Sequence, residues 1–211
     1  MNVKVLAILV VVLSIGRLSH ACSCAPAHPQ TTFCSSDVVI RGKILERRQQ
    51  EGDSGHLISY KVKQIKMFKG FDVMAEVENI YTSDSQSLCG FEPDLQNQDR
   101  DYYLVGNVHN NKSIYTNLCF FSKPWKELTS SQKVALLGSY AAGCECEIIP
   151  CVFMPCSVTE INQCLWTDSL LRRRGAGPQE QRLSCFKQTN GYCKWDSGKS
   201  YRKSQLLRGN E

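Results

Sequence analysis

Twelve cysteines constrain this chain of 211 residues more than any other feature. All of them follow a segment with the layout of a secretory leader, residues 1–21. Lys4 supplies its positive charge, Val5 to Ile15 form an apolar run, and Ser19-His20-Ala21 is a small-x-small cleavage site. The apolar run is too short to span a bilayer. We therefore expect a secreted, extracellular protein that starts at Cys22 and does not insert into membranes. An even cysteine count in an exported chain predicts a disulfide framework.

The cysteines form two groups whose spacing differs. One group is widely spaced and the other is crowded, so we place a domain boundary at Glu145, between a domain of residues 22–145 and one of residues 146–211. Spacing alone leaves 15 pairings for each group of six. The wide group is Cys22, Cys24, Cys34, Cys89, Cys119 and Cys144, and the crowded group is Cys146, Cys151, Cys156, Cys164, Cys185 and Cys193.

Short runs of β-branched and aromatic residues separate the cysteines of the first group. Five such runs within about 90 residues predict a small closed barrel. They are Val38–Ile40, Ile58–Val62, Val77–Tyr81, Tyr102–Val105 and Ser113–Thr116. The second group is rich in proline and glycine, which favours a loop-rich, mostly β module held by disulfides.

A helix is expected after the predicted strands. Thr129-Ser130-Ser131-Gln132 has the pattern of a capping box, in which the first and last side chains bond to each other's backbone. Apolar residues then follow at helical spacing, so the helix should pack on the barrel. These residues are Val134, Leu137, Tyr140 and Ala141.

Common enzyme motifs are missing from the sequence. It contains no G-x-S-x-G, no H-E-x-x-H and no glycine-rich phosphate loop, and its histidines lack metal-ligand spacing. We expect His28 and His109 to be structural or solvated. The Cys-x-Cys pairs could hold zinc as thiolates, but export and the even count favour disulfides. A bacterial lipoprotein would also begin at cysteine, but its lipobox requires leucine where this chain has Ser19. We expect no enzymatic activity, no cofactor of its own and no nucleic-acid partner.

Several longer motifs resemble one protein family. "CSCAPAHPQTTFC", "VVIRGK", "YKVKQIKMFKGF", "YT" ahead of "SLCG", "GCEC" and "CLWTD" are similar to the tissue inhibitors of metalloproteinases, most nearly the type 2 and type 4 branches. The similarity extends over the chain from Cys22 onward and includes all the cysteines. It implies a mainly β fold: a five-stranded OB-fold barrel of the netrin type with packed helices, followed by a small disulfide-rich domain. It also implies the pairs Cys22–Cys89, Cys24–Cys119, Cys34–Cys144, Cys146–Cys193, Cys151–Cys156 and Cys164–Cys185.

The resemblance also implies a function. The chain should inhibit zinc metalloproteinases, including matrix metalloproteinases, in a one-to-one complex. A free N-terminal residue offers an amine nitrogen and a carbonyl oxygen, which could chelate the catalytic zinc of the target and displace its water. In an extended segment Cys22 and Cys24 point to the same side, so Ser23 projects toward the partner. The alternative is a netrin-module protein that binds matrix or growth factors without inhibiting.

Residues that bind the protease can be carried over from the family motifs. They are Cys22, which would ligate the zinc of the target, and Ser23, Cys24, Ala25, Pro26, Ser35, Ser87 and Leu88. The loop from Arg47 to His56 is shorter than in type 2 inhibitors, which puts one accessory contact in doubt.

The C-terminal tail departs from the family pattern. From Lys194 to Glu211 it is basic, whereas type 2 inhibitors end in an acidic tail that helps to bind the hemopexin-like domain of a proenzyme. That partner is therefore left open, and so is a glycosaminoglycan site, although a solvated basic tail is the simpler interpretation. Asn111-Lys112-Ser113 is an N-glycosylation sequon between two predicted strands.

Overall fold

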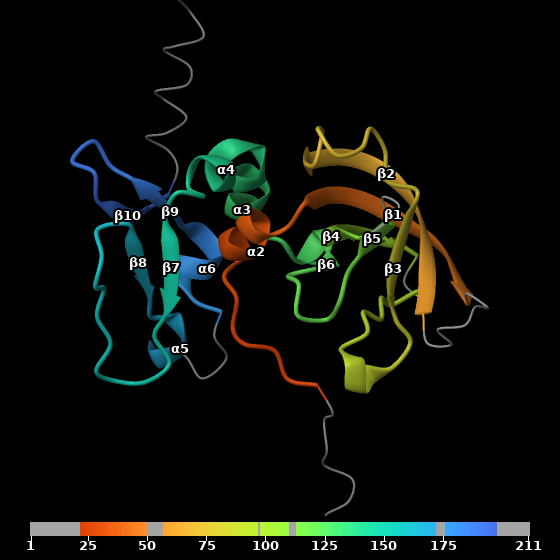
Figure 1. Ribbon diagram of the computed structural model, residues 1–211, viewed down its shortest axis with the longest axis horizontal. Helices are drawn as coiled ribbons and strands as arrows, with labels where there is room; N and C mark the ends of the chain where they lie inside the picture. The colour runs from red at the N-terminus through yellow and green to blue at the C-terminus, as the bar shows by residue number, and fades with distance from the viewer. Residues whose placement is uncertain (1–21, 50–56, 97, 110–112, 172–175, 198–211) are drawn as a thin grey trace, which may run out of the picture.

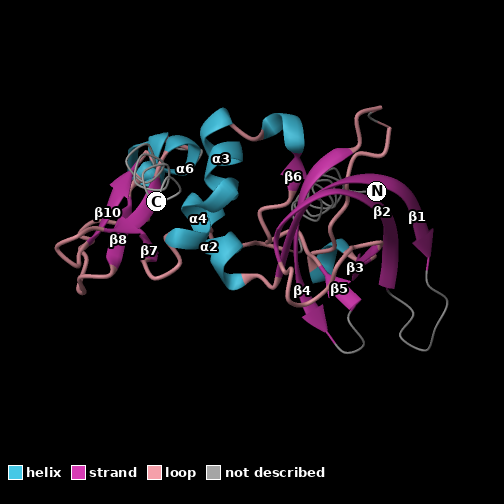
Figure 2. Cartoon of the chain, turned by 90° about the horizontal axis from the view of Figure 1, so that it is seen from above, coloured by secondary structure: helices cyan, strands magenta, loops and turns pink. Residues whose placement is uncertain are grey.

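The computed structural model describes residues 22–49, 57–96, 98–109, 113–171 and 176–197. The predicted leader, the predicted glycosylation site Asn111 and most of the basic tail lie outside these residues. A six-stranded sheet occupies one end of the molecule, two small sheets occupy the other, and helices stand between them (Figures 1 and 2). Within the described ranges, no helix has the length and apolar character needed to cross a membrane.

The large sheet contains all five predicted strands and a short sixth. Its order is β1-β2-β3-β5-β4-β6, and β4 also pairs with β1. Each of the five strands β1, β2, β3, β5 and β4 therefore pairs with two others of the five, in a closed series. The β3–β5 pairing is parallel and the other pairings are antiparallel. The strands are β1 (Val38–Gln49), β2 (Leu57–Lys69), β3 (Asn79–Ser83), β4 (Asp101–His109), β5 (Ser113–Tyr115) and β6 (Lys123–Pro124).

The predicted strand boundaries need correction. β1, β2 and β4 are much longer than their apolar runs, and the pairing of β1 with β2 continues through register shifts as far as Gln49 opposite Ile58. The predicted strand Ser113–Thr116 ends one residue earlier, at Tyr115. The predicted strand that begins at Val77 starts two residues later, at Asn79. The N–H of Val77 donates instead to the side chain of Gln64, at 3.0 Å, so it does not join the ladder.

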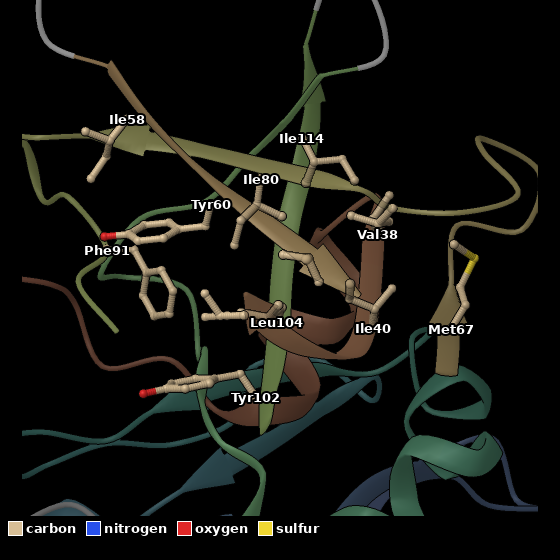
Figure 3. Packing of buried hydrophobic residues seen from close by; sticks show 13 residues of the cluster. Val38, Ile40, Ile58, Tyr60, Met67, Ile80, Phe91, Tyr102, Leu104 and Ile114 are labelled. Atoms are coloured by element: carbon tan, nitrogen blue, oxygen red, sulfur yellow. The ribbon is translucent and has the colours of Figure 1, made fainter. Parts of the chain in front are cut away.

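The core of this sheet is lined by alternate residues of its strands. Figure 3 shows Tyr60, Phe91 and Tyr102 gathered at one end, with Val38 and Met67 toward the other. The ring of Phe91 meets the rings of Tyr60 and Tyr102 edge to face, at centroid distances of 6.3 and 6.2 Å. Aromatic pairs prefer such edge-to-face contacts to direct stacking.

Helices cover a second cluster of buried residues on the outside of β1 and β4. The cluster includes Phe33, Val39, Tyr103, Leu136 and Tyr140. The elements around it are α2 (Pro29–Ser35), η3 (Trp125–Glu127), α3 (Ser130–Val134), the π-type turn η4 (Ala135–Ser139) and α4 (Tyr140–Ala142). The predicted capping box is present, with Thr129 and Gln132 bonded to each other's backbone N–H groups.

The face that this helix buries agrees with the prediction at Tyr140 but not at Leu137 and Ala141. Leu137 is 62% exposed and Ala141 is also exposed, although both were expected to pack on the sheet. The buried stripe instead runs through Gln132, Ala135, Leu136, Ser139 and Tyr140. These positions have the spacing i, i+3, i+4, i+7 and i+8, although the backbone kinks at Gly138, with φ 153°. Two of them are polar, so apolar residues alone do not indicate this face.

Beyond Glu145 lies a region that we call the C-terminal module, residues 146–171 and 176–197. β7 and β8 pair in parallel, and β9 and β10 pair antiparallel. Its small core consists mainly of disulfide cysteines, with Ile148 and Trp166. The elements are β7 (Glu147–Pro150), β8 (Gln163–Trp166), α5 (Asp168–Leu171), α6 (Pro178–Arg182), β9 (Ser184–Lys187) and β10 (Cys193–Asp196).

Six disulfides join the twelve cysteines, all of which lie in the described ranges, and none stays free. They are the same six pairs that the family resemblance implies, and none crosses Glu145. Hydrogen bonds do cross it: Thr129 Oγ1 donates to the carbonyl of Gln181 at 2.6 Å, and Gln132 Nε2 donates to that of Glu180 at 3.1 Å. The C-terminal module is therefore attached to α3 by polar contacts.

Candidate functional site

The segment that precedes α2 contains most of the predicted site. We call residues Cys22–Ala27 the N-terminal segment; they form neither helix nor strand. Ser23, Cys24, Ala25 and Pro26 are exposed, and Cys22 is half-buried. In Figure 1 the segment runs from α2 to the edge of the molecule. An exposed segment without secondary structure keeps a single conformation only if other parts of the protein fix it.

Two disulfides fix the beginning of the N-terminal segment. Cys22 is bonded to Cys89 and Cys24 to Cys119, and the four sulfur atoms lie within 4.8 Å of one another. This sulfur cluster contains no free thiolate, so the alternative of a zinc site made from Cys-x-Cys is wrong. Cys89 adopts the left-handed conformation, with φ 56°, which is uncommon for a residue with a side chain. The bridge thus holds the segment against a tightly turned loop.

That loop carries two of the predicted contact residues. Ser87 and Leu88 belong to the short helix η1 (Gln86–Leu88), and both are exposed, Leu88 to 63%. The carbonyl of Ser85 accepts hydrogen bonds from the N–H groups of Leu88 and Gly90, both at 3.1 Å. The Cys22–Cys89 bridge places the N-terminal segment beside this loop, so the structure brings Ser87 and Leu88 next to Cys22.

Leu118 belongs to the same surface and was not predicted. It is 57% exposed, its N–H donates to the carbonyl of Cys89 at 2.8 Å, and Cys119 follows it. Two leucines, Leu88 and Leu118, therefore flank the sulfur cluster on its two loops. The sequence contained a signal for this, because the dipeptide Leu-Cys occurs at both places.

Ser35 is the predicted contact residue that the structure leaves apart from the sulfur cluster. It is exposed and ends α2 on the side that leads into β1. A helix of seven residues is about 10 Å long, which separates Ser35 from the N-terminal segment. Its hydroxyl donates to the carbonyl of Thr32 at 3.4 Å, within α2.

His28 anchors the other end of the N-terminal segment. It is 1% exposed and caps α2, with Nδ1 accepting from the N–H of Gln30 at 3.1 Å. Nε2 therefore carries the proton and donates to the carbonyl of Gln179 in the C-terminal module, at 3.1 Å. The ring also packs against Trp166 and Trp195, at centroid distances of 5.5 and 5.1 Å. His28 is structural, as the sequence predicted, but its partners lie far along the chain.

The environment of His28 favours the neutral ring. Desolvation by burial is the main cause, and it lowers the pKa of His28 to about 4, although the Gln179 carbonyl and the Asp168 carboxylate act in the opposite direction. Asp168 is itself 1% exposed and accepts from the indole N–H of Trp166 at 3.1 Å and from the N–H of Glu180 at 2.8 Å. Hydrogen bonds to Asp168 thus fix the residues that surround His28.

Gln30, in the first turn of α2, bonds to both sides of the domain boundary. It is 1% exposed, and its Nε2 donates to the carbonyls of Gly143 and Cys185, both at 2.9 Å. Its Oε1 accepts from the N–H of Cys185 at 2.8 Å. A Cβ on Gly143 would lie 2.4 Å from Gln30 Nε2, so only glycine leaves room for this side chain.

Comparisons with known proteins agree with these features. A family model described as tissue inhibitor of metalloproteinase matches residues 20–195. Metalloproteinase inhibitor 3 of Xenopus laevis is 41% identical over 184 residues, which cover 87% of this chain and 85% of that protein. Metalloproteinase inhibitor 4 of Mus musculus is 40% identical over 188 residues, which cover 87% of this chain and 83% of that protein. The motif resemblance had predicted type 4, together with type 2, but not type 3. The chain therefore belongs to the tissue inhibitors of metalloproteinases, a family of inhibitors and not of enzymes.

Proposed function

We propose that this chain is a secreted inhibitor of zinc metalloproteinases, matrix metalloproteinases and their relatives, and that it acts through Cys22 in a one-to-one complex. The observation that carries the proposal is the N-terminal segment: Ser23 to Pro26 are exposed, and disulfides at Cys22 and Cys24 hold them beside η1. Two exposed leucines, Leu88 and Leu118, extend the surface on the adjoining loops. Disulfide-paired cysteines suit an oxidising, extracellular compartment.

The bonding of Cys22 determines which of its atoms can act as ligands. Its sulfur is bonded to Cys89, so a thiolate ligand is excluded. What remains are the carbonyl oxygen and, after cleavage behind Ala21, the α-amine. Together these two atoms form a five-membered chelate with a metal. A catalytic zinc has three protein ligands and an open position for water, and the chelate would replace that water.

Preorganisation explains why two disulfides should hold so short a segment. Ordering a flexible loop on binding costs free energy, and a segment that is already held in the bound conformation avoids most of that cost. Ser23 lies between the two bridged cysteines and is exposed, so its side chain is free to enter the specificity pocket of the protease. We include Cys24, Ala25, Pro26, Ser87, Leu88 and Leu118 in the contact surface, with Ser35 at its edge.

We also propose a division of the fold. The five strands whose pairings return to β1 form an OB-fold barrel of the netrin type, and residues 22–145 are the inhibitory domain. This is supported by the strand order and by disulfides that stay within each half. Residues 146–211 are the disulfide-rich domain with the basic tail. Binding of a proenzyme hemopexin-like domain through this domain, and of a glycosaminoglycan by its tail, are left open.

The proposal is tested by adding one alanine ahead of Cys22 in the secreted protein. The extension moves the amine away from the zinc but leaves both disulfides and the sheet core intact. We expect inhibition of a metalloproteinase catalytic domain to weaken at least about 1,000-fold, which corresponds to about 4 kcal/mol. The melting temperature should not change, because the extension is joined to an exposed segment.

A matched control carries the additional alanine after Glu211 and should inhibit normally. Full inhibition by a folded chain extended at Cys22, with the extension verified by mass, would contradict chelation. The alternative of a binding module for matrix or growth factors would then be the better interpretation.

A further inference from the structure

The N-terminal segment is held at both ends, but by different parts of the protein. The sulfur cluster holds Cys22 and Cys24, and the C-terminal module holds His28. Between these anchors lie Ala25, Pro26 and Ala27, which span at most about 3.6 Å each. So short a connection leaves little slack between His28 and Cys24. The direction of the segment therefore depends on where α2 begins.

The start of α2 is fixed largely by residues beyond Glu145. His28 donates to Gln179 and lies against Trp166 and Trp195, and all three belong to the C-terminal module. Gln30 makes two of its three side-chain hydrogen bonds to Cys185, in β9. These groups are buried, and an unsatisfied buried polar group is costly. Gln30 and His28 consequently have one favourable position.

We propose that His28 and Gln30 are positioning residues, through which the C-terminal module sets the direction of the N-terminal segment and so takes part in inhibition. Neither side chain is exposed, so neither can touch a protease directly. They act by keeping Cys22 and Ser23 in the conformation that binds. This inference rests on the proposed function, because it assigns the C-terminal module a role at the same site.

Two glutamines of the chain make a matched pair for testing this. Gln30 and Gln132 are both buried, at 1% and 4% exposure, and each donates through Nε2 to a carbonyl of the C-terminal module, Cys185 and Glu180 respectively. Gln30 leads directly to the N-terminal segment, whereas Gln132 lies in α3. Gln30→Met removes three hydrogen bonds, two of them to Cys185 across the junction. Gln132→Met removes one across the junction, to Glu180, and the capping bond from Thr129.

The experiment measures two quantities on the full secreted chain: the inhibition constant for a metalloproteinase catalytic domain, and the backbone order parameters of Ser23, Ala25 and Ala27 by NMR. Both variants should lose thermal stability. For Gln30→Met we expect the inhibition constant to rise about tenfold, because a looser segment must be ordered on binding. Its order parameters should fall from about 0.85 toward 0.6 or less. Gln132→Met should change the inhibition constant less than about twofold.

Equal effects of the two variants on inhibition, or unchanged order parameters in Gln30→Met, would overturn the inference. If Gln30→Met does not fold, His28→Asn takes its place: asparagine can still cap α2, but it is too short to reach Gln179. The two proposals fail in different ways. Normal inhibition by the alanine-extended chain refutes chelation, while the order parameters still decide whether Gln30 positions the segment.

Discussion

Protonation of His28 should destabilise the protein in mild acid. The ring is enclosed by Trp166, Trp195 and the Gln179 carbonyl, with the Asp168 carboxylate as the nearby charge. A proton on Nδ1 would remove the acceptor for the N–H of Gln30 and would bury a positive charge. The perturbation is therefore a change of pH alone, from 7 to 4.5.

The magnitude follows from the pKa of His28, which burial lowers from 6.5 to about 4. Because the unfolded chain binds the proton more tightly, this stabilisation is complete above pH 6.5 and is lost as the pH falls toward 4. At 1.36 kcal/mol for each pKa unit, the full loss is about 3 kcal/mol, and most of it should be present at pH 4.5. Glu180 titrates with the opposite sign, because burial raises its pKa. The effect of His28 must therefore be isolated by comparison.

Urea unfolding, followed by tryptophan fluorescence at several pH values, makes that comparison between the wild-type chain and His28→Asn. The variant is less stable at pH 7 but has no imidazole to protonate. The free energy of unfolding of the wild type should therefore fall by about 2–3 kcal/mol more than that of the variant between pH 7 and 4.5. Parallel curves for the two proteins would refute a buried, neutral His28.

Four further predictions concern individual residues. Tyr103 is buried and its hydroxyl has no hydrogen-bond partner among the described residues, so Tyr103→Phe should leave the urea midpoint unchanged or raise it. Tyr102→Phe should lower the free energy of unfolding by about 1 kcal/mol, because the Tyr102 hydroxyl accepts from the N–H of Asp94 at 2.9 Å. A Tyr103→Phe variant less stable than Tyr102→Phe would be inconsistent with this structure. Ser23→Gly should weaken inhibition without changing the melting temperature, and unchanged inhibition constants for several proteases would remove Ser23 from the site. Glycosidase treatment should lower the mass of the secreted protein by releasing a glycan from Asn111, whereas a constant mass would show that the sequon is empty.

Local features of the fold were predictable from the sequence. The five strands follow from runs of β-branched and aromatic residues, and the capping box at Thr129 depends only on residues three positions apart. The face of the following helix was not predictable from apolar residues, because Gln132 and Ser139 occupy buried positions of the stripe. Gln132 is tolerated there because it bonds to the backbone of Thr129 and Glu180.

For the candidate site, the exposure of local segments could be predicted, but contacts with distant partners could not. The exposed residues Ser23 to Pro26 and the loop with Leu88 follow from the motifs that the chain shares with its family. The burial of His28 and Gln30 could not be read from their neighbours in sequence, because their partners Gln179 and Cys185 lie 151 and 155 residues away. Cysteine spacing left the pairing open, and the resemblance supplied it.

A crystal structure of the complex with a metalloproteinase would show whether the backbone of Cys22 binds the catalytic zinc. We expect the α-amine nitrogen and the carbonyl oxygen of Cys22 both to lie about 2.0–2.2 Å from the zinc, where the catalytic water would otherwise be bound. A complex in which the zinc keeps its water and Cys22 lies beyond bonding distance would rule out chelation.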